Sequence, residues 1–332
     1  MTNPTEFKAW QVRESNGEYQ GSEQTLNTAD LPDNDVLIKV SHSSLNYKDA
    51  LSASGNKGVT RNFPHTPGID AAGEVVDSAT GEPAVGSKVI VTGYDLGMNT
   101  AGGFGEYIRV PVSWCVAMAP GWDARTAMIY GTAGLTAGLC VQKLLTMGAR
   151  PEQGKVAVSG ASGAVGSVAV ELLAGLGFDV VAISGKAGHT DELKALGASE
   201  VVGRDALAAE KKPMLKPVFA NAVDTVGGQP LAELLKQILP GGSVSCCGLV
   251  AGPQLETTVL PFILRGVNLL GVDSVEIPLA EKAAIWEKFA GAWACPKTEA
   301  TARTIGRGEL DGALQAFLKG ESSGKIVLDH SL

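Results

Sequence analysis

The stretch Ser43-Ser-Leu-Asn46-Tyr47-Lys48-Asp49 brings together three side chains with the hydrogen-bonding chemistry of a catalytic site. A tyrosine hydroxyl and an asparagine amide can both donate to an oxygen that gains negative charge during a reaction. We therefore predict that Tyr47 is a catalytic donor and Asn46 a second one, while Asp49 orients the loop. The alternative for Tyr47 is a half-buried side chain that makes one structural hydrogen bond.

A second stretch, from Val156 to Gly166, has the form of a phosphate-binding turn. An apolar run of strand length leads into Gly160, Gly163 and Gly166, and a helical pattern and a second apolar run follow. In such a βαβ unit the turn offers backbone N–H groups and a helix N-terminus to a phosphate. Ser162 stands where the usual G-x-G-x-x-G pattern has its middle glycine, so the context carries most of the specificity. The turn predicts a dinucleotide site, and a purely structural turn is the alternative.

The end of the second strand of this unit indicates which dinucleotide binds. Sites for NAD usually place an acidic residue there, where it accepts from the ribose 2′-hydroxyl. This chain has Ser184, Gly185 and Lys186 instead, and Arg204 follows the next predicted strand. Because cations suit a 2′-phosphate and a carboxylate would repel it, we predict NADPH. Two solvated surface cations are the alternative.

Composition excludes several classes of function. The chain has 332 residues, 27 basic against 35 acidic side chains and a net charge of −8, which disfavours nucleic acids and anionic membranes as general partners. No secretory signal and no apolar stretch of membrane-spanning length is visible. The five cysteines include no C-x-x-C motif, which is typical of a reduced, cytoplasmic protein.

Two domains are expected for a chain of this length. The first 125 or so residues contain short strands separated by turns, among them 36–40, 73–77 and 88–92. From residue 126 onward strands and helices alternate, which predicts an α/β domain with a parallel sheet and helices on both faces. A final strand at 325–329 is expected to return to the N-terminal domain.

The order and spacing of four motifs resemble the medium-chain dehydrogenase/reductase superfamily, specifically its zinc-free, quinone-oxidoreductase-like branch. The motifs are the Asn46-Tyr47 stretch, Pro67-Gly-Ile-Asp70, Gly131-Thr-Ala-Gly-Leu-Thr136 and the glycine turn. Further stretches are similar to the acrylyl-CoA reductase subgroup, including Arg61-Asn-Phe-Pro64, Ser184-Gly-Lys186, Thr257 to Arg265 and Gly271-Val-Asp-Ser274. The resemblance implies a β-rich GroES-like catalytic domain at 1–125, completed by 274–332, and a doubly wound Rossmann NADPH-binding domain at 126–273.

No metal site is expected. Zinc dehydrogenases of this superfamily have a cysteine near the position of Asn46 and a histidine where this chain has Ile69. The four-cysteine structural lobe is missing as well, because no cysteine occurs before Cys115, and the four histidines are scattered. Without zinc to stabilise an alkoxide, alcohol oxidation is disfavoured, whereas hydride addition to a conjugated C=C bond needs only positioned donors.

The resemblance also assigns cofactor contacts by position. It implies that Tyr47 lies beside the cofactor and that Ser162, Gly163, Ala164 and Val165 contact the pyrophosphate. Leu249 and Ile263 would pack against the nicotinamide, and Ser274 and Lys325 would close the pocket.

The implied activity is NADPH-dependent reduction of the C=C bond of a short 2-enoyl-CoA, of the acrylyl-CoA to propionyl-CoA type. A homodimer is implied by the superfamily. The nearest alternative is an NADPH:quinone oxidoreductase, which would use an apolar acceptor. An alternative of another class is a non-catalytic NADPH-binding or sensing protein.

Overall fold

The computed structural model describes residues 4–332 and divides into two compact units. Unit 1 runs to Thr132 and includes Ser274–Ala290 and Thr301–Leu332, whereas unit 2 holds Ala133–Asp273 and Gly291–Ala300. Residues 126–132 and 291–300 therefore fall in different units from the domains in which the sequence analysis places them. Helix α2, from Ala124 to Thr146, belongs to both units.

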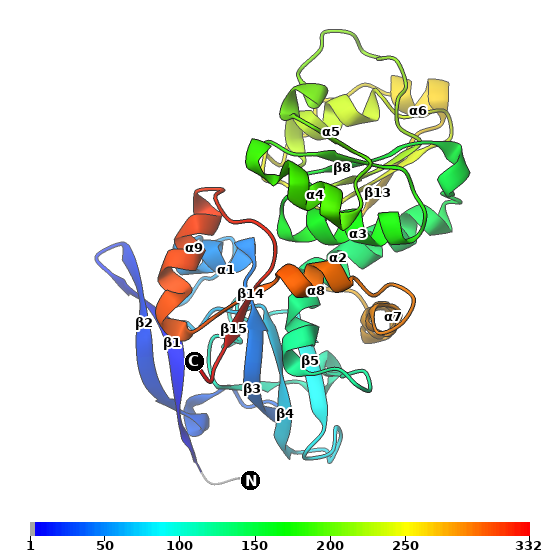
Figure 1. The fold of residues 1–332 in the computed structure, drawn as a ribbon. Coiled ribbons are helices and arrows are strands. Elements are labelled where there is room, and N and C mark those ends of the chain that lie inside the picture. Colours follow the sequence, from blue (N-terminus) through cyan, green and yellow to red (C-terminus); the bar gives the residue numbers. More distant parts are fainter. Residues whose placement is uncertain (1–3) are drawn as a thin grey trace. The chain divides into compact units, whose positions relative to one another are not determined.

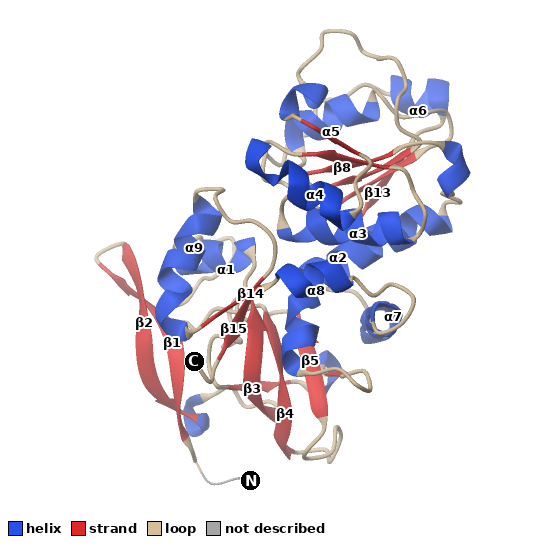
Figure 2. Cartoon of the chain, viewed as in Figure 1, coloured by secondary structure: helices blue, strands red, loops and turns tan. Residues whose placement is uncertain are grey.

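Unit 2 is built on a six-stranded parallel sheet with the strand order β10-β9-β8-β11-β12-β13. Helices lie on both sides of it (Figures 1 and 2). The alternation of strands and helices predicted this α/β architecture, and the structure confirms it. The strands are β8 (Val156–Ser159), β9 (Val180–Ile183), β10 (Glu200–Val202), β11 (Asn221–Asp224), β12 (Ser243–Cys246) and β13 (Asn268–Gly271). The helices are α3 (Ala164–Gly175), α4 (Thr190–Leu196), α5 (Gly228–Leu235), α6 (Leu260–Arg265) and, at the unit boundary, α8 (Pro296–Thr301).

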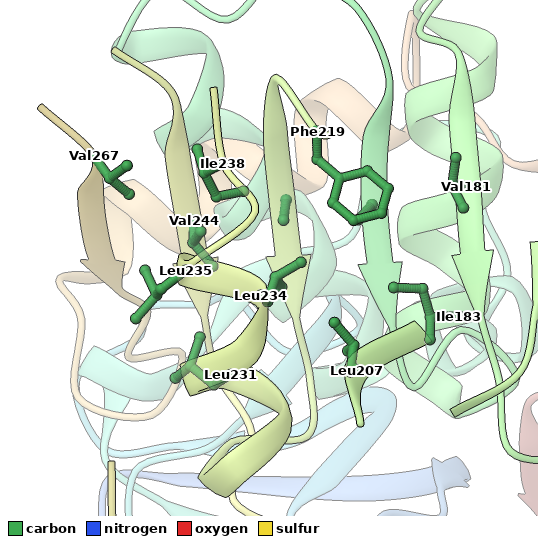
Figure 3. Packing of buried hydrophobic residues seen from close by; sticks show 12 residues of the cluster. Val181, Ile183, Leu207, Phe219, Leu231, Leu234, Leu235, Ile238, Val244 and Val267 are labelled. Carbon is green, nitrogen blue, oxygen red and sulfur yellow. The ribbon is translucent and has the colours of Figure 1, made fainter. Parts of the chain in front are cut away.

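The core of unit 2 forms where α5 packs on the sheet. Leu231, Leu234 and Leu235 recur at helical spacing, so they share one face of α5 and are all buried. They belong to one apolar cluster with strand residues such as Val244 (Figure 3). This packing holds the carboxyl ends of the strands in place, and the glycine turn begins at one of those ends.

Unit 1 contains a seven-stranded, mostly antiparallel sheet and a separate hairpin. The sheet has the order β14-β15-β3-β4-β5-β7, with β6 paired to β3, and β1 pairs with β2. The strands are β1 (Glu6–Ser15), β2 (Glu18–Asn27), β3 (Val36–Ser44), β4 (Asp70–Ser78), β5 (Lys88–Thr92), β6 (Tyr107–Val110), β7 (Val116–Ala117), β14 (Arg303–Ile305) and β15 (Ile326–Asp329). The expected strands at 36–40, 73–77 and 88–92 all occur, and β15 returns to β3 as expected.

Besides the first part of α2, unit 1 contains α1 (Tyr47–Ala53), α7 (Leu279–Phe289) and α9 (Leu310–Leu318). Helices α1 and α9 share an apolar core with the hairpin, in which Trp10, Leu45 and Leu314 are buried. This hairpin was not predicted from the sequence, because β2 is largely polar and has no fully buried residue, so it lacks the apolar alternation of a buried strand. No helix in residues 4–332 is long and apolar enough to cross a membrane.

Candidate active site

Asp70 is the centre of a buried hydrogen-bond network in unit 1. Its carboxylate accepts from the Asn46 amide Nδ2 at 2.8 Å and from the Ser44 hydroxyl. Thr132 contributes two more bonds, from its backbone N–H at 2.9 Å and its hydroxyl at 2.6 Å. Asp70 is fully buried, and these donors compensate for the lost solvation of its charge. Three motifs far apart in the sequence therefore meet at one carboxylate.

Gly131 makes this geometry possible. It interrupts α2 with φ of 51° and ψ of −157°, a region that residues other than glycine rarely adopt. A Cβ atom at this position would overlap the Ser44 hydroxyl and would lie 2.7 Å from the Asp70 carboxylate. The glycine thus turns the chain so that the next N–H, that of Thr132, reaches Asp70.

Asp49 is a second fully buried carboxylate. It accepts from the backbone N–H of Asn46 at 2.7 Å and from that of Ile69 at 2.8 Å. Burial, with a smaller contribution from the negative charge of Asp70, raises the pKa of Asp49 to about 7. Asp49 therefore joins the Asn46-Tyr47 loop to the loop that ends at Asp70.

Lys325 supplies the cation of this cluster. It directly precedes β15, whose Ile326 carbonyl accepts from the Leu45 N–H at 3.0 Å, so it lies beside the start of the Asn46-Tyr47 loop. Its ammonium group is buried and has no hydrogen-bond partner within residues 4–332. Burial lowers the pKa of Lys325 to about 8, and the charges of Asp70 and Asp49 oppose that shift. A buried charge without an acceptor is costly, which is typical of a functional group.

The predicted catalytic residues, Asn46 and Tyr47, differ in how freely their side chains can bind a substrate. The Asn46 amide nitrogen already donates to Asp70 and has a second contact, at 3.3 Å, with the Ser44 hydroxyl. Tyr47 is 39% exposed and Asn46 is 8% exposed, so Tyr47 is the more accessible of the two to a substrate. Both catalytic roles stay predictions. No catalytic role for Asp70 or Lys325 was predicted from the sequence, although Asp70 ends the Pro67-Gly-Ile-Asp70 motif.

The side chains of unit 1 do not fit a zinc ion. Ile69 is a buried apolar residue, and the Asn46 amide faces a carboxylate. Among residues 4–332, no three His, Cys, Asp or Glu side chains lie close enough together to hold a metal. The ligand set that zinc prefers, thiolate, imidazole or carboxylate in a tetrahedral array, does not occur there.

The glycine turn in unit 2 has the geometry of a phosphate cradle. Gly160 has φ of +61°, and the Gly163 N–H returns to its carbonyl at 2.9 Å. Helix α3 begins at Ala164 with Gly163 as its N-cap, so the N–H groups of Ala164 and Val165 have no acceptor within the helix. A Cβ atom at Gly166 would lie 2.7 Å from Ala161 Cα, so only glycine lets the helix approach the turn this closely. These features fit a pyrophosphate at the helix N-terminus.

The residues predicted to bind a 2′-phosphate also come together. The Ser184 hydroxyl lies 2.9 Å from that of Ser162 and accepts from the Lys186 N–H at 3.2 Å. The Arg204 side chain lies against Gly185, since a Cβ built there would be 2.6 Å from Arg204 Cδ. Serine hydroxyls and a guanidinium group at the end of β9 make a cationic edge without a carboxylate at position 184, 185 or 186, which fits NADPH.

The remaining predicted contacts belong to different units. Leu249 and Ile263 lie in unit 2 and are large apolar side chains exposed by 62% and 69%. Ser274 is mostly buried and lies in unit 1, as Lys325 does. Their roles at a cofactor stay predictions.

The fold and these sites define a two-domain, nucleotide-binding oxidoreductase. The strand order of unit 2 is that of a Rossmann domain, with the glycine turn following β8 at the point where the order reverses. Family models agree with both units: the alcohol dehydrogenase GroES-like domain matches residues 32–120 and the zinc-binding dehydrogenase domain matches residues 164–290.

Individual relatives are similar along nearly the whole chain. An acrylyl-CoA reductase of Ruegeria pomeroyi is 41% identical over 317 residues, 95% of this chain and 96% of the relative. A quinone-oxidoreductase-like protein of Bacillus subtilis is 42% identical over 326 residues, 98% of this chain and 99% of the relative. Its crystal structure with NAD bound has a TM-score of 0.95 over 98% of this chain and 99% of that one.

A crystal structure from Escherichia coli with bound NADPH is 45% identical, with a TM-score of 0.93 over 97% of this chain and 99% of that chain. The chain therefore belongs to the medium-chain dehydrogenase/reductase family, in the branch that contains acrylyl-CoA reductases and quinone-oxidoreductase-like proteins. The resemblance predicted from the sequence motifs is confirmed.

Proposed function

We propose that this protein is an NADPH-dependent reductase of the C=C bond of short 2-enoyl thioesters, converting acrylyl-CoA to propionyl-CoA without zinc. The observation that carries the proposal is the buried Lys325 ammonium group, which has no hydrogen-bond partner within residues 4–332 and precedes the strand that pairs with the start of the Asn46-Tyr47 loop. The similarity to acrylyl-CoA reductases along 95% of the chain supports the choice of substrate.

The cofactor residues follow from the cradle in unit 2. Ser162, Gly163, Ala164 and Val165 would bind the pyrophosphate, and Ser184, Gly185, Lys186 and Arg204 would bind the 2′-phosphate. The bound NADPH of the E. coli relative supports this assignment. When bound, NADPH supplies the hydride.

The residues of unit 1 would stabilise the charge that this reaction creates. When the β-carbon of an enoyl thioester accepts a hydride, negative charge moves to the thioester oxygen. The Lys325 ammonium group and the Tyr47 hydroxyl would donate to that oxygen, and Asp70 and Asp49 would hold the loop in position. A proton added at the α-carbon then completes the saturated thioester.

One panel of assays separates this proposal from its alternatives. NADPH oxidation is measured with acrylyl-CoA, crotonyl-CoA and a benzoquinone, beside NADPH binding without an acceptor. We expect turnover with the enoyl-CoA substrates. Turnover only with the quinone would identify a quinone oxidoreductase, as the B. subtilis relative suggests. Tight binding without any turnover would instead identify a non-catalytic NADPH-binding protein.

The proposed active form is a cytoplasmic homodimer. Strand β13 stands last in the sheet of unit 2, so it offers an edge on which a second copy can pair. Val259, Ile263 and Leu264, in and just before α6, are large apolar side chains that are more than 60% exposed, and a second copy would cover such a surface. Light scattering on the purified protein tests this, and a monomeric mass at micromolar concentration would contradict it.

A further inference from the structure

Gly185 and Arg204 leave two neighbouring strands of unit 2 at the same end. Strands β9 and β10 are parallel, with Ile183 opposite Val202, and the Ser184 N–H donates to the Val202 carbonyl at 3.0 Å. Gly185 follows β9 by two residues, as Arg204 follows β10. The register of this pair therefore places the Arg204 side chain against the backbone of Gly185.

The contact between these two residues leaves no room for a side chain at position 185. A Cβ atom there would overlap the Arg204 guanidinium group and would lie 2.6 Å from Cδ. Gly185 is not among the glycines with positive φ, so its backbone conformation suits any residue. The arginine side chain is the obstacle, rather than backbone strain.

We propose that Gly185 is a positioning residue for NADPH selectivity, because it leaves the space in which the Arg204 side chain lies against the Gly185 backbone. This inference rests on the proposed function, and in particular on NADPH as cofactor. A guanidinium group in this position can donate to a phosphate through two N–H groups. With a side chain at 185, the guanidinium group must swing away, which removes a contact to the 2′-phosphate and none to a ribose hydroxyl.

Binding of NADPH and NADH to four proteins tests the inference: wild type, Gly185→Ala, Arg204→Ala and the double variant. Dissociation constants come from the fluorescence of the reduced nicotinamide, without any acceptor. We expect Gly185→Ala to weaken NADPH binding about tenfold or more, as the loss of a charge-assisted hydrogen bond would, and to change NADH binding less than about twofold. In the Arg204→Ala background, Gly185→Ala should not weaken NADPH binding any further.

The control is Gly188→Ala. Gly188 lies three residues further on, in the short 3-10 helix Ala187–His189, is exposed and has no atom within 4 Å of a Cβ built on it. This variant should bind both cofactors as the wild type does. Retained NADH binding by Gly185→Ala shows that the variant is folded.

Two results would overturn the inference. In one, Gly185→Ala weakens the binding of NADPH and of NADH equally. In the other, the loss of NADPH affinity in Gly185→Ala adds fully to the loss in Arg204→Ala. A wild type with no preference for NADPH would overturn the proposed cofactor as well, so the wild-type measurement alone distinguishes the two failures.

Discussion

At the scale of single residues, Lys325 has the most unusual environment in the cluster around Asp70. Burial favours the neutral form of a lysine and so lowers its pKa. The charges of Asp70 and Asp49 favour the charged form, but they offset only part of this shift. The pKa of about 8 therefore means that the cation is present below pH 8 and is lost as the pH rises through that value. If the mechanism uses this cation, the plot of kcat against pH must have a descending limb at the same pH.

We predict that kcat for an enoyl-CoA falls about tenfold per pH unit above roughly pH 8, and that Lys325→Arg moves this limb beyond about pH 10, since a guanidinium group stays charged. Lys325→Met should lower kcat about 100-fold at pH 7. The measurement is the pH dependence of kcat between pH 6 and 10.

The matched control is Lys282, which is also fully buried but donates to the carbonyls of Thr92 at 2.7 Å and Val275 at 2.9 Å. Lys282→Arg should leave the position of the limb unchanged. A limb that stays near pH 8 in Lys325→Arg would remove Lys325 from the mechanism.

Tyr47 is tested by removing only its hydroxyl. Tyr47→Phe should lower turnover by about 10- to 100-fold, and at least as much as it lowers NADPH affinity, because the hydroxyl is expected to donate in the transition state. Steady-state kinetics and cofactor titration on the same preparation give both numbers. Unaltered kinetics would leave Tyr47 as a structural residue.

At the scale of elements, the break in α2 at Gly131 allows a backbone N–H group to hydrogen-bond to Asp70. An uninterrupted helix would direct the N–H of Thr132 along its own axis, whereas the turn at Gly131 delivers it to Asp70. The sequence showed the Gly131-Thr132 pair within a resembling motif. It gave no sign that the interruption supports a carboxylate that stands 62 positions earlier.

We predict that Gly131→Ala lowers the free energy of unfolding by about 3 kcal/mol, because it adds both backbone strain and an overlap with the Asp70 network. Gly148→Ala is the control: its φ is +85°, but no atom lies within 4 Å of the added Cβ. It should cost about 1 kcal/mol, the strain alone. Urea denaturation measures both values, and equal losses would show that the overlap relaxes without cost.

At the scale of the whole molecule, cofactor binding and stability are linked. A ligand that binds only the folded state stabilises it by about 2.7 kcal/mol at 100 times its dissociation constant. At equal concentrations, NADPH should therefore raise the melting temperature more than NADH does. In Lys186→Ala/Arg204→Ala this difference should vanish, because the 2′-phosphate then has no cationic partner at the end of β9. A difference that persists in this variant would place the phosphate elsewhere.

The sequence by itself determined the features that depend on neighbours along the chain. Periodicity located the strands and helices of unit 2, since apolar residues must recur at the spacing of the element that buries them. The NADPH-binding site was predicted from features that are likewise local. These are the glycine turn, Lys186 and the absence of an acidic residue where the second strand of the βαβ unit ends. The hairpin Glu6–Asn27 was missed because half of its pattern faces solvent.

Only the tertiary structure decided how the charges of unit 1 are arranged. Ser44 and Asn46 lie far from Asp70 and Lys325 in the chain. The pairing of β3 with β4 brings Asp70 to Ser44 and Asn46, and the pairing of β15 with β3 brings Lys325 to the same end of β3. The same is true of Gly185 and Arg204, which meet because β9 and β10 lie in register. Burial of a charge and the distance between two strands are properties of the folded chain, and no local pattern encodes them.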